Sequence, residues 1–425
     1  MVTPVFRSLL LLLAVLPVAP ATRANDLLRL YELALSRDSI LQSASARADA
    51  AVEVRPQAIA QLLPQVATDA SRSRDTSSYQ VQVSQAVWNF ESFSRLKEAN
   101  REAQSAQARL EGERQSLMLR TAEAYFGILA ARDQLATARS ERSAFATLLE
   151  QAQNREATGV GPRSAVEQVQ SFYDATEARV IDSENALEVA MIAMAQIVGE
   201  PAGDVASLRD EIPLASPEPA SVEQWVESAR RDSPDVRASR LAVEAADLAI
   251  SAQLGKGLPT LSLVSTSSHV SPASAVGGGG SVDTVGLAFS YPLFQGGAVA
   301  SGMRQSRALY RQAQADYETA VRDTESQART AYRGVVSGIQ RIGAAQRAVD
   351  SARAAVEASR NNVEFGTGTE FDLLNAQNNY SAALRIFSQS RYDYLHSMLA
   401  LKRQSGRLSE GDLIAIDSLL VGPAP

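Results

Sequence analysis

Cysteine is absent from this 425-residue chain, and the only histidines are His269 and His396. Without cysteine the chain has no disulfide, no thiolate metal ligand and no cysteine nucleophile. Two histidines leave few candidates for a metal ligand or a general base. The glycine run 277–280 is not followed by the Lys-Ser or Lys-Thr pair of a phosphate-binding loop. We therefore expect no metal, no cofactor and no enzymatic activity.

Aromatic residues are also scarce. They make up 6% of the chain, and much of its 45% hydrophobic content is alanine. Small apolar side chains favour closely packed helices over a thick aromatic core. The formal net charge is −7, which argues against a nucleic-acid partner because such a partner requires a basic face. The composition thus favours a largely helical protein that does not bind nucleic acid.

One short apolar run lies close to the N-terminus. Arg7 precedes the run 9–16, and Thr22-Arg23-Ala24 ends in a small residue. This order is typical of a secretory signal peptide, which we assign to residues 1–24. A membrane-spanning helix needs about 20 apolar residues, and neither this run nor any later one is long enough. We therefore expect an exported protein and, because no cysteine follows the signal, one without a lipid anchor.

A repeat of uncharged residues, spaced alternately by four and three, runs from Tyr317 to Val363. Not one residue on this repeat is charged, although Arg, Asp, Glu and Gln fill the positions between them. Such spacing keeps one stripe of a helix facing a partner helix, as in coiled coils. A helix over 298–363 would be on the order of 95 Å long, so it has to extend far beyond one compact core.

The chain contains the same arrangement twice, which indicates an internal duplication. The recurring motifs are Leu63-Pro64 and Leu258-Pro259, Ala124-Tyr125 and Ala331-Tyr332, and Gly159-Val160-Gly161 and Gly366-Thr367-Gly368. We assign the first repeat to residues 25–200 and the second to 223–406. Residues 201–222 connect the repeats, and residues 407–425 follow the second.

Each repeat is predicted to contain a helix, two strands, a long helix, a tight turn and a returning helix. In the first repeat we predict strands at 65–73 and 79–88, a long helix at 91–156, a turn at 158–162 and a returning helix at 164–198. In the second repeat we predict strands at 260–268 and 283–292, a long helix at 298–363, a turn at 365–369 and a returning helix at 370–403. Long helices joined by so short a turn have to run antiparallel, so each repeat should form a helical hairpin.

The predicted strands alternate between apolar and small or polar residues. In 284–291, Val, Leu, Phe and Tyr share one side, while Thr, Gly, Ala and Ser share the other. This alternation is typical of outer-membrane barrels, although a soluble sandwich or hairpin can show it too. The signal peptide and the glycine-rich loop favour the membrane. Four strands are too few to enclose a pore, so three or more chains would have to combine theirs.

Three aromatic residues lie at or just beyond the ends of the two second strands, where interfacial side chains would contact outer-membrane lipid. They are Trp88, Tyr291 and Phe294.

Over nearly its whole mature length the chain resembles the TolC family of trimeric outer-membrane channel-tunnels. The motifs that carry the resemblance are Leu62-Leu63-Pro64-Gln65, Thr121-Ala122-Glu123-Ala124-Tyr125-Phe126, Gly257-Leu258-Pro259-Thr260-Leu261, 285–297, Arg391-Tyr392-Asp393-Tyr394 and Leu408-Ser409-Glu410-Gly411-Asp412-Leu413. The resemblance implies a mainly α fold with β structure: long antiparallel coiled-coil hairpins and four transmembrane strands per protomer, which complete a 12-strand barrel in a homotrimer. It also implies a tunnel across the periplasm, an equatorial region formed by 201–222 and 407–425, and a closed periplasmic tip.

The resemblance implies an exit duct for tripartite efflux, type I secretion or both, in the outer membrane of a Gram-negative bacterium. Its partners would be a periplasmic membrane-fusion adaptor and an inner-membrane transporter of the ABC or RND type. The alternative is a periplasmic coiled-coil adaptor of an export complex, which would have one hairpin and no barrel-type strands.

Relatives narrow the tunnel with two aspartates three residues apart after the second turn, and Asp372 and Asn375 occupy these positions here. Three Asp372 carboxylates around one axis would favour cations and raise the pKa of at least one of them by mutual repulsion. A carboxylate near a helix start is, however, also favourable by itself.

The residues expected to meet the adaptor are those of the two turns: Gly159, Val160, Gly161, Gly366, Thr367 and Gly368. Their glycines are also explained by the positive φ angles of tight turns. The family's latch, a Tyr and an Arg near the second turn bonded to an Asp after the first, is not kept. Its positions hold Val363, Gly368 and Ala165.

Overall fold

The computed structural model describes residues 27–74, 76–272 and 279–421. The predicted signal peptide, residues 277–278 of the glycine-rich loop and the last four residues lie outside this part of the chain. Within the described residues, no helix combines the length and the apolar character needed to cross a bilayer.

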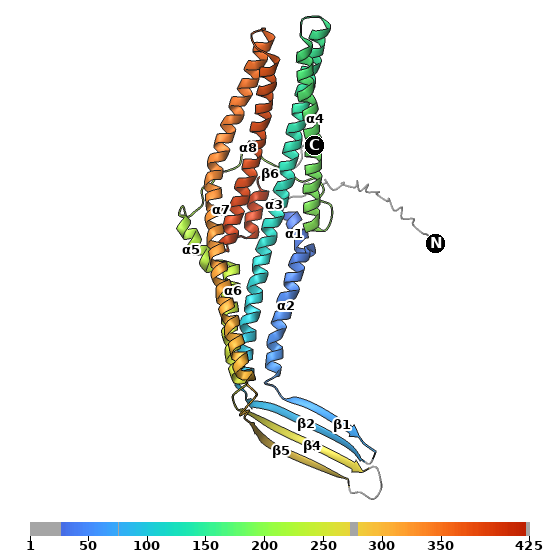
Figure 1. Ribbon diagram of the computed structural model, residues 1–425, viewed down its shortest axis with the longest axis vertical. Coiled ribbons are helices and arrows are strands. Elements are labelled where there is room, and N and C mark those ends of the chain that lie inside the picture. The colour runs from blue at the N-terminus through green and yellow to red at the C-terminus, as the bar shows by residue number, and fades with distance from the viewer. Residues whose placement is uncertain (1–26, 75, 273–278, 422–425) are drawn as a thin grey trace, which may run out of the picture.

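Two long helical hairpins form one end of the elongated molecule, and a four-stranded sheet forms the other (Figure 1). The first repeat contains α1 (Leu27–Arg37), α2 (Ser39–Ala60), β1 (Gln65–Arg72), β2 (Thr76–Trp88), α3 (Phe90–Ala157) and α4 (Arg163–Val198). The short strand β3 (Ser207–Leu208) follows. The second repeat contains α5 (Val222–Asp232), α6 (Pro234–Gly255), β4 (Thr260–Pro272), β5 (Gly280–Ser290), α7 (Ala298–Glu364) and α8 (Glu370–Gln404). The described chain ends with α9 (Glu410–Asp417) and β6 (Leu420–Val421).

The segment before the strands is two helices in each repeat, whereas the sequence suggested one. In the first repeat the Asp38 carboxylate accepts a hydrogen bond from the Leu41 amide at 2.7 Å and so starts α2 anew. Arg120 of α3 forms an ion pair with Asp38 at 3.0 Å, which fixes the break against the long helix. In the second repeat Pro234 begins α6, where its missing N–H would have no partner in any case.

The strand bounds also differ from the expected ones. β2 begins at Thr76, and β4 extends to Pro272, so both are longer than predicted. β5 covers Gly280–Ser290 and ends before Tyr291, because Pro292 cannot donate a hydrogen bond to a ladder. Tyr291 and Phe294 therefore lie in the connection to α7.

The sheet has the strand order β1-β2-β4-β5, and all neighbouring strands are antiparallel. Its register places Val66 opposite Val83 and Leu263 opposite Leu287, so these four side chains share one face. All four are exposed, as is Phe289 on the same face. The opposite face is mostly Ser, Thr, Gln and small residues, and it also carries Asp69, Val264, Val270 and Val282. Among the described strands, β1 and β5 each have a neighbour on one side only.

The uncharged stripe predicted on the second long helix is the stripe that α7 buries. All of its buried residues lie on the 4-3 repeat: Thr324, Ala328, Ala331, Val335, Gly338, Ile342, Ala345, Val349 and Val356. α7 packs along α8 and α3 along α4, and α3 also packs against α8. Small side chains allow α7 and α8 to approach each other closely. At Gly338 the two helices are so close that an added Cβ would lie only 3.2 Å from the Tyr394 Cβ of α8.

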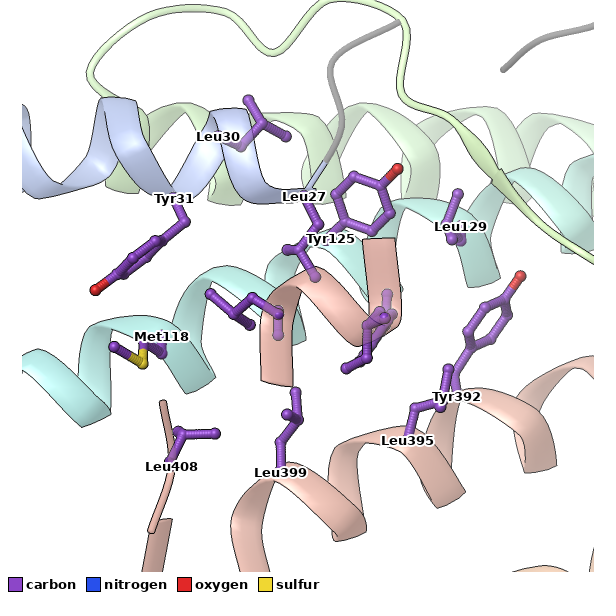
Figure 2. Packing of buried hydrophobic residues seen from close by; sticks show 14 of the residues in the cluster. Leu27, Leu30, Tyr31, Met118, Tyr125, Leu129, Tyr392, Leu395, Leu399 and Leu408 are labelled. Carbon is purple, nitrogen blue, oxygen red and sulfur yellow. The ribbon is translucent and has the colours of Figure 1, made fainter. Parts of the chain in front are cut away.

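The largest apolar cluster lies about halfway along the molecule (Figure 1), and Figure 2 shows its packing. It joins α1, α3, α8 and α9 through residues that include Leu27, Tyr31, Met118, Leu129, Leu395, Leu399 and Leu413. The connection between the repeats is tied to this level by side-chain hydrogen bonds. Tyr125 donates to the carbonyl of Ala206 at 2.7 Å, and Arg391 donates to the carbonyl of Arg209 at 3.1 Å. β3 pairs with β6, so the connection and the C-terminal segment lie together.

Candidate functional site: the hairpin tips and the sheet

The two turns at the hairpin tips have the same backbone construction. Gly159 and Gly366 have φ angles of 73° and 72°, which side chains other than glycine rarely adopt. The amide of Gly161 donates to the carbonyl of Arg155 at 3.0 Å, and the amide of Gly368 donates to the carbonyl of Asn362 at 3.0 Å. These bonds satisfy carbonyls that the ends of α3 and α7 would leave unpaired.

Each turn presents a large apolar side chain to solvent. Val160 is 78% exposed and Phe365 is 79% exposed. Phe371, in the first turn of α8, is 45% exposed. The predicted contact residues thus lie on a surface with bare apolar groups, which suits a protein partner.

Asp372 takes part in a capping box at the start of α8. Its amide donates to the Thr369 hydroxyl at 3.2 Å, while its carboxylate accepts from the Thr369 hydroxyl at 2.6 Å and from the Thr369 amide at 3.2 Å. These bonds favour the ionised form and lower the pKa of Asp372 below its ordinary value. Asp372 therefore caps the start of α8 and also carries an exposed negative charge, so the capping role and the proposed pore role are compatible.

Asp372 and Asn375 line the same shallow groove between α7 and α8. The wall opposite them consists of small residues of α7, namely Ala348, Ser351, Ala352 and Ala355. Since the two polar residues are one helical turn apart, they point to the same side of α8. No charged residue other than Asp372 lines this groove in the described chain.

The three positions of the family's latch line another groove, which lies between the two tips. Ala165, Val363 and Gly368 supply no charged group there. Arg155, near the end of α3, instead forms an ion pair with Glu370 at the start of α8. Sequence reasoning missed this contact. The sequence shows only a cation near the end of one helix and an anion near the start of another. The helix dipole favours each of these charges separately, so their presence does not indicate that they pair.

A second missed feature is a buried carboxylate between the hairpins. Glu141 of α3 is fully buried, with Arg179 of α4 at 2.9 Å and Arg385 of α8 at 3.9 Å. Burial raises the pKa of Glu141, although both arginines oppose this shift. The three charges therefore connect three helices from both hairpins. Nothing in the sequence distinguishes Glu141 from the solvated acids around it.

The predicted interfacial aromatics lie where the sheet meets the helices. Trp88 ends β2 and its ring centroid is 6.3 Å from that of Phe93, in the first turn of α3. Trp88, Tyr291 and Phe294 are 54%, 50% and 88% exposed. Exposed aromatic rings at one end of an apolar sheet face are typical of the boundary between lipid and water.

Two long antiparallel hairpins, a central band and a sheet with an exposed apolar face define a class of elongated proteins built to extend from a membrane. The chain belongs to the family described as "Outer membrane efflux protein", whose model matches residues 30–200 and 225–407. This confirms the predicted family and places the protein in the outer membrane of a Gram-negative cell, from which it extends into the periplasm. The family comprises transport proteins.

The chain is similar to individual members along most of its length. It is 29% identical to the outer membrane protein TolC of Vibrio cholerae, covering 94% of this chain and 95% of the relative. It is 28% identical to the alkaline protease secretion protein AprF of Pseudomonas aeruginosa, covering 92% and 86%. The structure of the CmeC outer membrane channel of Campylobacter jejuni matches with a TM-score of 0.81 at 14% identity, covering 93% and 90%.

These findings bear on the two functional hypotheses from the sequence. A periplasmic adaptor required one hairpin and no barrel-type strands, whereas this chain has two hairpins and a four-stranded sheet. Family membership supports the other hypothesis, an exit duct of the outer membrane.

Proposed function

We propose that three copies of this chain form a channel-tunnel, with four strands from each copy in one 12-strand barrel. The observation that carries the proposal is the sheet itself. Its apolar face is exposed, and β1 and β5 each lack a second neighbour within the described chain. Membrane sheets have to close because unpaired backbone groups are costly in lipid. Pairing β1 of one copy with β5 of the next removes both edges.

The hairpins of the three copies would continue the barrel as a tunnel through the periplasm. The tip residues Gly159–Gly161 and Gly366–Gly368 would then meet a periplasmic membrane-fusion adaptor, and an inner-membrane ABC or RND transporter would supply the cargo. The relative AprF is named for protease secretion and the family for efflux. We infer that this duct serves type I secretion as well as efflux.

Purification tests the assembly. The protein should require detergent, and light scattering should give a protein mass of roughly three times that of one mature chain. A water-soluble single subunit would contradict the proposed duct.

Asp372→Asn is expected to remove the cation preference of the reconstituted channel. Asparagine can still accept the bonds from Thr369, so this variant removes the charge while the helix start keeps its cap. A ring of carboxylates favours cations because it makes the local potential negative. Reversal potentials in a salt gradient measure the preference.

Glu364→Gln is the matched control, because Glu364 is an exposed carboxylate at the same tip but does not line the Asp372 groove. It should leave the reversal potential close to that of the wild type. If the two substitutions changed the reversal potential equally, the proposed role of Asp372 in the pore would be contradicted.

A further inference from the structure

Polar and charged side chains occupy the far end of the apolar sheet face, away from the helices (Figure 1). The register places Arg72 opposite Ser77 and Ser77 opposite Ser271, so these three residues are neighbours across β1, β2 and β4. Tyr79 lies opposite His269, two positions closer to the helices on each strand. Because alternate residues of a strand share a face, all five lie on the face that carries the exposed apolar side chains. We call these five residues the outer patch.

Two aromatic rings mark the ends of the apolar part of this face. A bulge before Trp88 turns its side chain to this face, where it lies opposite Leu261. Tyr79, which is 53% exposed, lies near the other end of the same strand. The stretch from Tyr79 to Trp88, less the bulged residue, measures about 27 Å, or about 20 Å in height at the usual barrel tilt. The apolar band of an outer-membrane barrel is about 25 Å tall, so the outer patch lies level with the outer headgroups.

The charges of the outer patch suit an anion. Arg72 is exposed, as is Arg74 in the turn between β1 and β2, and neither forms an ion pair among the described residues. The only carboxylate that the described strands place on this face is Asp283 of β5, at the opposite edge of the sheet from β1. An unpaired guanidinium binds a phosphate group through two parallel hydrogen bonds.

Hydroxyl groups surround this cation. Ser77 and Tyr79 are exposed, and the Ser271 hydroxyl lies 3.0 Å from Nε2 of His269, which holds the imidazole beside the serine. Hydroxyl groups donate and accept hydrogen bonds, as the hydroxyls of a sugar require. Hydrocarbon tails offer no hydrogen-bond partner, so contact with the lipid interior does not account for these side chains.

We propose that the outer patch binds the phosphorylated sugar headgroup of a glycolipid in the outer leaflet of the membrane. Arg72 binds a phosphate, the hydroxyl groups bind the sugar, and the acyl chains lie along the apolar side chains nearer the helices. The inference rests on the proposed barrel, because it requires the apolar sheet face to point outward. Each copy of the chain then binds one glycolipid.

Native mass spectrometry of the detergent-purified trimer tests the site. Bisphosphorylated lipid A should add one molecule per copy of the chain, whereas the same lipid without its phosphates should bind about tenfold more weakly or less. Arg72→Gln should weaken binding of bisphosphorylated lipid A by about tenfold or more, because it removes the charge-assisted hydrogen bonds. Arg72→Lys keeps the charge and should retain part of the affinity.

Arg360→Gln is the matched control. Arg360 is also an exposed arginine without an ion pair among the described residues, but it lies in the last turns of α7, at the hairpin tip. Its replacement should leave lipid A binding unchanged. If the Arg72 and Arg360 variants bound lipid A as tightly as the wild-type trimer, the site would be overturned and the proposed duct would stand. A protein that forms no trimer would count against the barrel itself.

Two other probes separate a glycolipid from simpler anions. Phosphatidylglycerol has a phosphate but no sugar, so it should bind more weakly than lipid A, and equal binding would overturn the role of the hydroxyl groups. Inorganic phosphate at the same concentration should not displace lipid A. Displacement would show a general anion site and contradict the proposed glycolipid.

Discussion

Replacing Glu141 by alanine is expected to destabilise the hairpin region by about 2–4 kcal/mol. Removing this side chain leaves Arg179 without the acceptor that it binds at 2.9 Å and opens a void at a fully buried position. Breaking a fully buried ion pair costs about 3–5 kcal/mol, and the value here is lower because both arginines partly reach solvent and because burial already disfavours the ionised form of Glu141. Faster amide hydrogen exchange in the adjoining parts of α3, α4 and α8, together with a lower Tm, would show the loss.

Glu184→Ala provides a matched control. Glu184 also pairs with an arginine of the neighbouring helix, Arg139 at 2.8 Å, but both side chains are about half exposed. Exposed pairs contribute only about 0.2–1 kcal/mol, so this variant should remain close to the wild type. If both variants lost equal stability, burial of Glu141 would not be the cause.

The same carboxylate should affect how stability depends on pH. Because burial raises the pKa of Glu141, the folded protein binds this proton more tightly than the unfolded chain does. Between the folded pKa and the ordinary value near 4.5, this group makes the free energy of unfolding rise as the pH falls. Glu141→Gln cannot titrate. The free energy of unfolding of the wild type minus that of the variant should therefore increase toward acid pH. A difference that does not change with pH would contradict the raised pKa of Glu141.

The long-range architecture was predictable because it repeats in the sequence. The 4-3 stripe on α7 involves only spacing along one helix, and each residue on it faces the partner whatever that partner is. Breaks in the shorter helices were harder to predict. The break between α1 and α2 at Asp38 is held by an ion pair with Arg120, which is far away in sequence. In the second repeat the position that corresponds to Arg120 is occupied by Gln327. Local helix propensity contains no information about such a contact.

In the candidate site, too, local features were predictable from the sequence and contacts between the hairpins were not. The turns at Gly159 and Gly366 follow from local chemistry, since their positive φ angles demand glycine. The contacts of Glu141 and Arg155 depend on how the two hairpins pack against each other. Each is one charged residue among many on a long helix, and only the three-dimensional arrangement singles it out.

Breaking the Arg155–Glu370 ion pair is expected to favour an open tip by about 1–2 kcal/mol, which corresponds to a 5- to 30-fold shift in the equilibrium. This pair joins the end of α3 to the start of α8, across the groove where the family's latch residues are missing. Leu374 still packs against Phe145 and Val169 in the variant, so the hairpins loosen without separating. Arg155→Ala and Glu370→Gln should therefore both raise the open probability of the reconstituted channel.

A charge exchange separates this ion pair from general damage to the tip. Arg155→Glu/Glu370→Arg restores opposite charges at the same two positions, so it should return the open probability toward the wild-type value. Arg163→Ala is the control, because Arg163 pairs with Glu167 within α4 and does not bridge the hairpins. Its open probability should match the wild type. If the exchanged pair stayed as open as either single variant, a bond between the hairpins could not be what holds the tip, and apolar packing around Leu374 would remain as the restraint.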